Sequence, residues 1–375
     1  MDEYSDRTKE EDEDVLLSAA IEGMFLNSEL FDHQRGASNK GYKKIDMGTL
    51  VLSTQNLHLG NANVNLRFNH GMVSPAYKTY HIHDCSIELI AEWVKSEKAK
   101  RFFYDATTVG ASVCRRNVEW DTLYDQPLYL PSEAEQERLA TFLTTLSARI
   151  KKQTELVEHL KKYKRGAIEA IFNRTISFSS DTQDSWKEFR LGEFARRITR
   201  KNGQTTDIPL TISAQHGLID QREFFSKTVA SSDMSGYYLL HKGEFAYNRS
   251  TSSEYPYGSI KRLDKYDKGA VSTLYLCFEA NEKIMESDFI MWYFESSRWH
   301  NGVREICAEG ARNHGLLNVP TAGFFDTVHY LPSNKAEQKQ IAAFLSSLDE
   351  RYTRAFSELE ELNKLKRGLY QSLFI

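Results

Sequence analysis

Apolar residues recur every three or four positions along two long stretches of the chain, residues 130–172 and 331–374. The apolar positions are Leu139, Phe142, Leu143, Leu146, Ile150, Val157, Leu160, Tyr163, Ile168 and Ile171 in the first, and Ile341, Phe344, Leu345, Leu348, Tyr352, Phe356, Leu359, Leu362, Leu365, Leu369 and Leu373 in the second. This period, flanked by Glu, Lys and Arg, predicts two helices that each bury one face against another helix. At ~1.5 Å per residue, each helix would be about 60 Å long.

The two stretches also repeat each other in sequence. With one residue inserted after Ser333, Glu135 aligns with Glu337, and Gln136 aligns with Gln338. The run Lys164-Arg165-Gly166 aligns in the same way with Lys366-Arg367-Gly368. A repeat of this kind indicates a duplicated architecture. We expect the two helices to pair antiparallel, with the preceding globular blocks at opposite ends and approximate two-fold symmetry.

The blocks that precede the helices repeat more faintly. The matching segments are residues 14–31 with 207–225, 42–55 with 237–250, and 71–80 with 269–278. Short β-rich runs bounded by Gly, Asn, Ser and Asp predict strands and hairpins, and helical patterns follow around residues 86–104 and 287–306. The expected fold class is α+β: two α+β domains separated by a pair of long antiparallel coiled-coil helices with pseudo-two-fold symmetry.

The predicted boundaries follow from these patterns. They are residues 1–130 for the first domain, 131–173 for the first helix, 174–185 for a polar linker, 186–331 for the second domain and 332–375 for the second helix. Residues 1–13 read as an acidic, disordered tail. The second domain opens with the segment WKEFRLGEF from Trp186, which the first copy lacks. The first domain is therefore predicted to be shortened, or to be completed by the C-terminal region.

Composition and charge limit the class of protein. A hydrophobic fraction of 41%, with 5 Trp, 19 Tyr and 21 Phe in 375 residues, indicates globular packing. The net charge of -4 does not exclude DNA, because the acidic start of the chain accounts for it. Four isolated cysteines, with no zinc spacing, fit a reducing cytoplasm and no metal site. No signal pattern and no apolar run of about 20 residues occur, so we expect a cytoplasmic protein with no membrane partner.

Sequence motifs for catalysis are missing. The chain contains no Pro-Pro and no Gly-Lys dipeptide, so it carries neither the [NDS]PP[YFW] pocket motif of amino-methyltransferases nor a P-loop. It also contains no GxSxG, HExxH or GxGxxG motif. His81 and His83 alternate near Asp84, but the second block has no matching cluster, which favours ordinary strand residues over a metal pair. The sequence indicates a binding protein rather than an enzyme.

Two divergent blocks joined by a paired helical spacer suit the reading of two separated sites on a long, roughly two-fold ligand such as double-stranded DNA. Divergence between the blocks predicts that the two half-sites differ in sequence. An alternative is a coiled-coil assembly or interaction protein that does not bind DNA. A self-contained nuclease or methyltransferase is disfavoured by the missing motifs.

The helical segments carry a family resemblance. AEQERLATFLTTL followed by LKKYKRGAIEAIF, and AEQKQIAAFLSSLDE followed by LNKLKRGLYQSLF, resemble the two conserved regions of the specificity subunit of type I restriction-modification enzymes. WKEFRLGEF and the Gly-anchored stretches 42–55, 237–250, 71–80 and 269–278 are similar to its target recognition domains. The resemblance implies a non-catalytic subunit that reads a bipartite, asymmetric DNA site and binds no cofactor. It also implies modification subunits that methylate adenine with S-adenosylmethionine, and restriction subunits that translocate and cleave DNA with ATP and Mg.

Candidate DNA contacts are polar, planar or forked side chains in loops between predicted strands. In the second domain they are Asn248, Arg249, Ser250, Tyr255 and Tyr257, then Arg312, Asn313 and His314. In the first domain they are Gln55, Asn56 and His58, then Arg115, Arg116 and Asn117. Lys261 and Arg262 are candidates for phosphate contact. The alternative for each residue is an ordinary solvated loop side chain.

Candidate partner contacts lie on the helices. Gln136 and Gln338 occupy matching first-turn positions, where they either contact a partner or cap free backbone amides, and capping is favoured. The pairs Lys164 and Arg165, and Lys366 and Arg367, face either the modification subunits or the DNA backbone. The alternative is a solvated helix face whose internal glycine marks a close approach of two helices.

Overall fold

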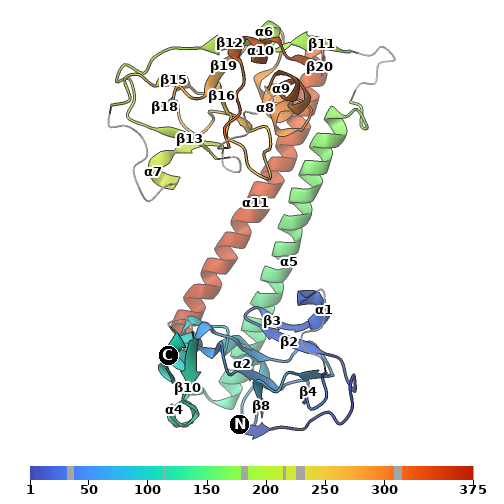
Figure 1. Cartoon of the computed structure of the whole chain (residues 1–375), viewed down its shortest axis with the longest axis vertical. Helices are drawn as coiled ribbons and strands as arrows, with labels where there is room; N and C mark the ends of the chain where they lie inside the picture. The colour runs from blue at the N-terminus through green and yellow to red at the C-terminus, as the bar shows by residue number, and fades with distance from the viewer. Residues whose placement is uncertain are drawn as a thin grey trace. The chain divides into compact units, whose positions relative to one another are not determined.

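The computed structural model describes residues 1–31, 38–112, 115–178, 185–213, 217–224, 233–307 and 315–374. The chain forms two compact units: a first unit of residues 1–157 and 355–375, and a second unit of residues 158–354. Each unit contains one end of both long helices, α5 (Glu133–Phe172) and α11 (Lys335–Leu373), which are drawn in green and red in Figure 1.

The two long helices run antiparallel and pack together within each unit. In the first unit Gln153 Nε2 donates to the carbonyl of Ala355 at 2.8 Å, and Arg149 forms an ion pair with Glu358 at 2.5 Å. In the second unit Lys164 Nζ lies 2.7 Å from Asp349 Oδ1. The prediction of a paired, antiparallel helical segment is therefore confirmed.

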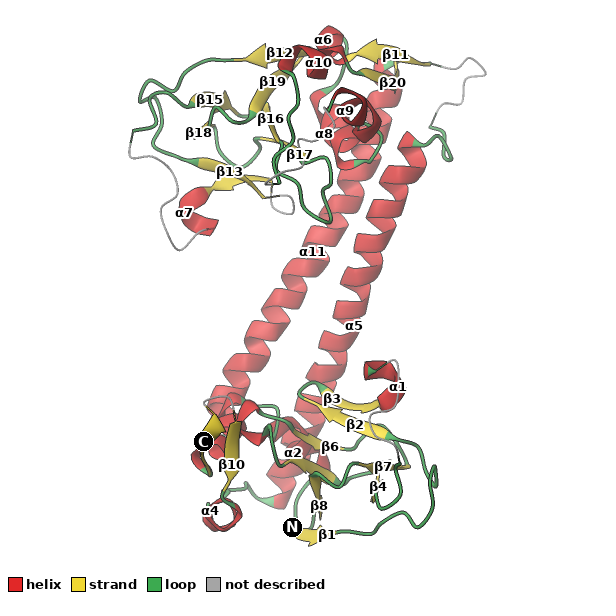
Figure 2. Ribbon diagram, in the orientation of Figure 1, coloured by secondary structure: helices red, strands yellow, loops and turns green. Residues whose placement is uncertain are grey.

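A four-stranded antiparallel sheet forms the centre of the second unit (Figure 2). Its order is β12 (Ala195–Ile198), β19 (Leu276–Ala280), β16 (Phe245–Asn248) and β17 (Ser259–Arg262). Three two-stranded pairs surround it: β13 (Leu210–Ser213) with β14 (Gly217–Asp220), β15 (Tyr238–His241) with β18 (Lys268–Val271), and β11 (Trp186–Arg190) with β20 (Val328–Pro332). The short helices are α6 (Leu191–Phe194), α7 (Gln221–Phe224), α8 (Ser287–Glu295), α9 (His300–Ile306) and α10 (Thr321–Asp326).

The first unit repeats this plan. Its central sheet has the order β1 (Asp2–Tyr4), β8 (Tyr77–His81), β5 (Leu50–Ser53) and β6 (Ala62–Val64). The surrounding pairs are β2 (Leu17–Ala20) with β3 (Gly23–Leu26), β4 (Lys43–Asp46) with β7 (His70–Val73), and β9 (Thr107–Ser112) with β10 (Arg115–Val118). Its helices besides the long pair are α1 (Asn27–Leu30), η1 (Leu57–Leu59), α2 (Ile87–Trp93), α3 (Glu97–Asp105) and α4 (Trp120–Asp125). The predicted α+β class is confirmed.

Each unit packs its own core onto the helix ends that it contains. In the second unit α8 buries Phe289, Ile290 and Tyr293 against both long helices, and Figure 1 places α8 and α9 beside α11. In the first unit Leu89 of α2 packs with Leu143 of α5 and Tyr370 of α11. Aromatic rings contribute to these cores, and Phe245 and Phe278 are stacked at 5.2 Å in the central sheet.

The acidic start of the chain is folded, which differs from the predicted disordered tail. Residues 2–4 form β1, which pairs antiparallel with β8 as an edge strand. Lys78 binds Glu3 at 2.8 Å, Lys44 pairs with Glu13, and Tyr4 stacks on His81 with ring centroids 3.9 Å apart. Lysines from other strands offset the acidic charges of this segment. The local composition does not predict these partners, because they are distant in sequence.

The opening segment of the second unit has no counterpart in the first. β11 pairs with β20 from Trp186 opposite Pro332 to Arg190 opposite Val328. Among the described residues of the first unit, no strand pairs with the matching segment 127–131. The C-terminal end of α11 joins the first unit through Tyr370 and Phe374, but it supplies helix and not this strand.

Candidate DNA interface and helix surfaces

The principal candidate loop of the second unit, residues 249–258, has a rigid base. Tyr247 is fully buried in β16, and its hydroxyl donates to the carbonyl of Tyr257 at 2.7 Å. Gly258 has a φ of +77°, and a Cβ there would lie 2.1 Å from the carbonyl oxygen of Asn248. Only glycine fits this close approach without a shift of backbone. The fold therefore fixes the backbone at both ends of the loop and does not restrict which side chains lie between them.

Arg249 follows β16 directly and is only half exposed. Its Nη2 donates to the carbonyl of Leu274 at 2.9 Å, whereas its Nε is buried and has no hydrogen-bond partner among the described residues. The first unit makes the same anchor with a shorter side chain, because Thr54 Oγ1 donates to the carbonyl of Ala76 at 2.7 Å. Arg249 thus anchors the loop with one nitrogen and retains unused donor capacity.

The structure brings this loop together with the end of the second candidate loop. Leu317 N donates to the carbonyl of Arg249 at 3.0 Å, and Thr251 N donates to the carbonyl of Gly315 at 2.7 Å. Ser250 lies between these two hydrogen bonds and forms an isolated antiparallel β-bridge with Leu316, and its side chain is exposed. Residues 310–314, with Arg312, Asn313 and His314, lie outside the described residues, but the residues that follow them are fixed beside Arg249.

The other loop residues are partly covered. Asn248 Oδ1 accepts a hydrogen bond from Ser250 N at 3.0 Å, so part of this amide shapes the turn. Tyr257 packs on the ring of His300, with centroids 5.1 Å apart. Burial raises the pKa of Tyr255, and the charges of Glu295 and Glu254 add to this effect. Both tyrosines remain half exposed.

Lys261 and Arg262 do not provide free positive charge for phosphate, in contrast to the prediction. Lys261 is buried in β17, and its Nζ lies 2.5 Å from Glu295 Oε1. Arg262 binds Asp264 and Asp288, each at 2.7 Å. Glu295 and Asp288 lie in α8, well apart from β17 in sequence, which is why a local basic pair was misleading, whereas Asp264 lies only two residues after Arg262.

In the first unit the corresponding loop follows Ser53, whose hydroxyl accepts from Asn56 N at 3.1 Å. Gln55 and Asn56 are exposed and keep their places as candidates. His58 is buried in η1, so it does not face a ligand as predicted. Burial, with a smaller contribution from the charge of Arg116, lowers the pKa of His58 and keeps its ring neutral.

The second candidate loop of the first unit corresponds to the β9–β10 pair. The guanidinium of Arg116 is held by its own hairpin, with Nε donating to Thr107 Oγ1 at 2.7 Å and its plane over the ring of Tyr104 at 4.1 Å. A bidentate base contact by Arg116 would break these bonds, so the structure disfavours the predicted role. Asn117 is exposed on β10, and Arg115 lies on the same strand.

Gln136 and Gln338 are buried, so neither faces a partner. Gln136 Oε1 accepts from Ser86 N at 2.9 Å, and Gln338 Oε1 accepts from Glu286 N at 2.8 Å. Ser86 and Glu286 are the N-cap residues of α2 and α8. The glutamines thus satisfy backbone amides, as the favoured alternative predicted, but they do so for a neighbouring helix and not for their own.

The repeated Lys-Arg-Gly run divides into an inner and an outer side. Lys164 pairs with Asp349, and Lys366 donates to Ser147 Oγ at 2.6 Å and pairs with Glu92 of α2 at 3.1 Å, so both ammonium groups bind within the protein and do not face a partner. Arg165 and Arg367 are exposed, with no ion pair to a described residue. A Cβ added at Gly166 or Gly368 would meet nothing within 4 Å, so these glycines do not mark a close helix–helix approach.

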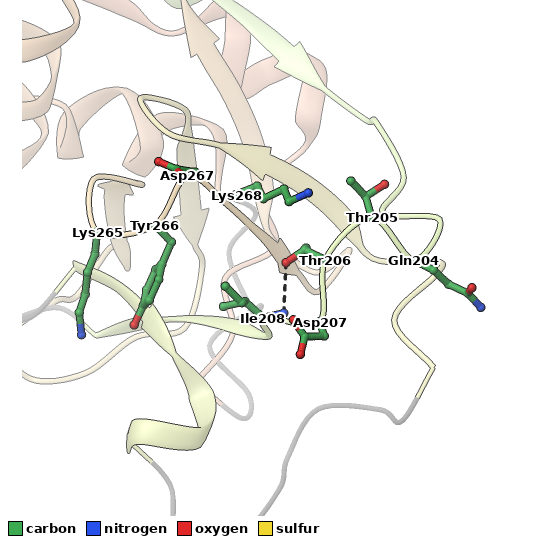
Figure 3. A pocket seen from close by; sticks show the side chains of 9 residues that line it. All are labelled: Gln204, Thr205, Thr206, Asp207, Ile208, Lys265, Tyr266, Asp267 and Lys268. Carbon is green, nitrogen blue, oxygen red and sulfur yellow. Dashed lines mark hydrogen bonds between the residues drawn. The ribbon is translucent and has the colours of Figure 1, made fainter.

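A polar pocket of about 660 Å³ lies elsewhere in the second unit (Figure 3). It is lined by Gln204, Thr205, Thr206, Asp207, Ile208, Lys265, Tyr266, Asp267 and Lys268. The Lys265 ammonium is already paired with Glu223 at 2.8 Å. None of the predicted contact residues lines this pocket.

Two further observations concern the described part of the chain. No group of three or more His, Cys, Asp or Glu side chains there is placed to hold a metal ion. No helix among these residues is both long and apolar enough to cross a membrane.

Sequence reasoning missed the exposed aromatic side chains of the first unit, Tyr104, Tyr124 and Tyr129. Strand and helix periodicity treats tyrosine as core, so the pattern alone does not separate a buried ring from an exposed one. Aligning residues 128–132 with 329–333 gives the useful signal, because the second copy is covered by β11 and the first has no matching segment.

No protein-family model matches the chain, and no curated protein matches it. Solved structures do match along nearly the full length. The S subunit of a type I restriction-modification system from M. genitalium has a TM-score of 0.57 at 14% identity, covering 91% of this chain and 87% of that one. A chain from a structural study of complex assembly and conformational transition in the type I R-M system has a TM-score of 0.51 at 13% identity, covering 99% and 94%. The chain therefore has the fold of a type I restriction-modification specificity subunit.

Proposed function

We propose that this chain is the DNA-specificity subunit of a type I restriction-modification system. Each unit would read one half of a bipartite, asymmetric DNA site, and the paired helices would set the spacing and dock the modification subunits. The near full-length likeness to the M. genitalium S subunit carries the proposal. The repeated sheet order supports it, because one frame holds different loop residues in the two units.

On this proposal the chain is not catalytic and binds no cofactor itself. Modification subunits would supply S-adenosylmethionine-dependent adenine methylation, and restriction subunits would supply ATP- and Mg-dependent translocation and cleavage. The work of this chain is recognition, in cytoplasm where the DNA lies. Its contribution would appear as the sequence preference of the complex rather than as a rate of any chemical step.

The best candidates for base contact are the side chains that remain available on the two loops. They are Arg249, Ser250, Asn248, Tyr255 and Tyr257 in the second unit, and Gln55, Asn56 and Asn117 in the first. Arg312, Asn313, His314 and Arg115 stay candidates from the sequence alone. Different donors at matching positions, such as Ser250 and Gln55, would give the two half-sites different sequences.

The decisive experiment is methylome sequencing of the host with and without this gene. Loss of one bipartite adenine-methylation motif on deletion, with return on complementation, is the expected result. A purified complex with modification subunits should also protect two short half-sites about one helical turn apart. Sequence-indifferent binding by this complex at moderate salt would overturn the proposal.

A substitution at Arg249 assigns one half-site to the second unit. Arg249→Thr copies Thr54 of the first unit, so it keeps a hydroxyl for the Leu274 anchor while it removes the guanidinium. We expect a loss of about 1–3 kcal/mol in binding, confined to one half-site. Gln55→Ala changes the exposed candidate next to Thr54 in the first unit, and it should affect only the other half-site. Equal losses at both half-sites would contradict the assignment.

For docking of the modification subunits, we propose the outer side of the helix pair, around Arg165 with Gly166 and Arg367 with Gly368. In each unit an exposed arginine stands beside a glycine that leaves space, and an exposed apolar side chain lies two residues before the arginine, Tyr163 and Leu365. The double substitution Arg165→Glu and Arg367→Glu should weaken assembly by at least about tenfold if charged contacts are lost. The double substitution Lys162→Glu and Lys364→Glu, at exposed aligned positions, is a control of equal charge change, and an equal effect would argue against this surface.

A further inference from the structure

The first unit leaves open an edge that the second unit covers. In the second unit β11 lies along β20, and Leu331 of β20 is 1% exposed. The aligned residue of the first unit, Leu130, is 41% exposed, and Tyr129 beside it is 82% exposed. No described residue donates a hydrogen bond to the backbone of Leu128, Tyr129 or Leu130, or accepts one from it.

The backbone of this segment is suited to strand pairing. In the second unit Ser333 N donates to the carbonyl of Ser185, and Leu191 N donates to the carbonyl of Thr327, at 2.8 and 2.9 Å. Hydrogen-bonded positions alternate in an antiparallel pair, so residues 329 and 331 bond to β11 while 328 and 332 do not. The prolines of the first unit, Pro127 and Pro131, align with 328 and 332. Their missing N–H groups therefore do not obstruct pairing.

The first unit also has a carboxylate, that of Glu135, at the position that binds the indole of Trp186 in the second unit. Trp186 Nε1 donates to Glu337 Oε1 at 3.0 Å, and Glu337 is buried by this contact. The aligned Glu135 is exposed, and it accepts instead from the hydroxyl of its neighbour Ser132 at 2.7 Å. The local bond occupies one oxygen, Oε2, and leaves Oε1 for an outside donor.

The open surface continues to where α6 would lie. In the second unit Leu191 and Phe194 of α6 are fully buried, and Gly192 approaches the carbonyl of Phe325. The residue aligned with Phe325 is Tyr124, whose ring is about half exposed. The exposed side chains Tyr124, Tyr129 and Leu130 thus lie at positions whose aligned residues in the second unit are next to β11 and α6.

We propose that residues 126–132 of the first unit form a docking edge for an extended segment of a separate polypeptide. The segment would pair antiparallel, place an aromatic N–H donor such as an indole on Glu135, and set apolar side chains over Leu130 and Tyr124. Main-chain bonds would give affinity, and the indole and apolar positions would give specificity. The occupant is defined by chemistry, as a strand of the Trp-x-x-Phe-x-Leu-Gly kind.

A labelled synthetic peptide of residues 184–194, DSWKEFRLGEF, tests the edge against the full chain by fluorescence anisotropy. Saturable binding to the wild-type chain is expected, with at least tenfold weaker binding after Leu130→Pro, which removes a backbone donor at an exposed position. A peptide with alanine in place of the tryptophan should also bind at least tenfold more weakly.

Two results would overturn the proposal. One is the absence of saturable binding up to millimolar peptide. The other is unchanged binding to the Leu130→Pro chain, because the peptide would then be exchanging with β11 in the second unit. Circular dichroism of the variant checks its folding, and Tyr129→Ser, which keeps the backbone donor, should retain most of the affinity.

Discussion

The two units share one sheet order but treat the segment before their long helix differently. In the second unit the strand Val328–Pro332 is paired with β11 and buries Leu331, whereas in the first unit the aligned Leu130 and Tyr129 are exposed. The central sheets and the buried glutamines are nevertheless alike. The frame that presents the loops thus depends on the four-stranded sheet and the helix ends, and not on the outer pair of strands.

The largest difference should appear when the two aligned leucines are truncated. Leu331→Ala opens a cavity in a packed core and should lower the free energy of unfolding by about 2–5 kcal/mol. Leu130→Ala removes an exposed side chain and should cost less than about 1 kcal/mol. Urea unfolding, read by hydrogen exchange of peptides from each unit, measures both. Equal costs would mean that the edge of the first unit is covered in solution.

A second difference between the two units concerns how their stability changes as the pH falls. His329 is buried between the hydroxyls of Tyr293 and Thr327, and burial lowers its pKa from 6.5 to about 4. Between these values the unfolded chain takes up a proton that the folded chain excludes, so stability falls as pH falls. The loss should reach on the order of 3 kcal/mol near pH 4. The first unit has Leu128 at this position and lacks this source of acid sensitivity.

Hydrogen exchange of the two units between pH 7 and pH 4, corrected for intrinsic rates, checks this prediction. His329→Gln should reduce the pH dependence of the second unit while it lowers stability at pH 7, because glutamine does not titrate. An unchanged slope in this variant would assign the acid sensitivity to other groups.

Substitution of the buried glutamines should have similar effects on the stability of the two units. Gln136→Ala and Gln338→Ala each leave an N-cap amide and the carbonyl of Pro131 or Pro332 without a partner. Each should cost about 1–3 kcal/mol in its own unit. The exposed Gln371→Ala is the control and should have little effect on unfolding. A large loss in only one unit would show that the two sites are not equivalent.

The smallest expected effect is an increase in the free energy of unfolding. Gly166→Ala and Gly368→Ala each place a methyl group in open space on a helix, so each should stabilise its unit by about 0.5–1 kcal/mol. Gly192→Ala is the contrasting control, because its Cβ would lie 3.2 Å from the carbonyl of Phe325 and should destabilise. Thermal unfolding monitored by circular dichroism detects these shifts. Destabilisation by either helix substitution would indicate a contact at that glycine.

Sequence periodicity gave the long helices to within a few residues, since an amphipathic stripe reports burial directly. The repeat also gave the α+β blocks and the missing opening segment. The sequence pattern did not predict ion pairs between residues that are distant in sequence. Lys261 forms an ion pair with Glu295, and Lys78 forms one with Glu3 in the acidic start of the chain. Gln136 illustrates the same limit, because its position suggests a cap and only the fold reveals which helix it caps.

The lysines inside the helix pair bear on how such a chain could arise from half-length ancestors. Lys164 meets Asp349 of the opposing long helix, whereas Lys366 meets Ser147, the residue aligned with Asp349, and Glu92 of α2. Two copies of the second half, paired through their long helices, would oppose Lys366 with Asp349 twice, and two copies of the first half would oppose Lys164 with Ser147 and Glu92. The lysine would therefore have a carboxylate partner in either pairing, worth up to about 1 kcal/mol per pair. The partner comes from the opposing long helix in one case and from α2 in the other, so the two halves neutralise the same lysine position with different elements.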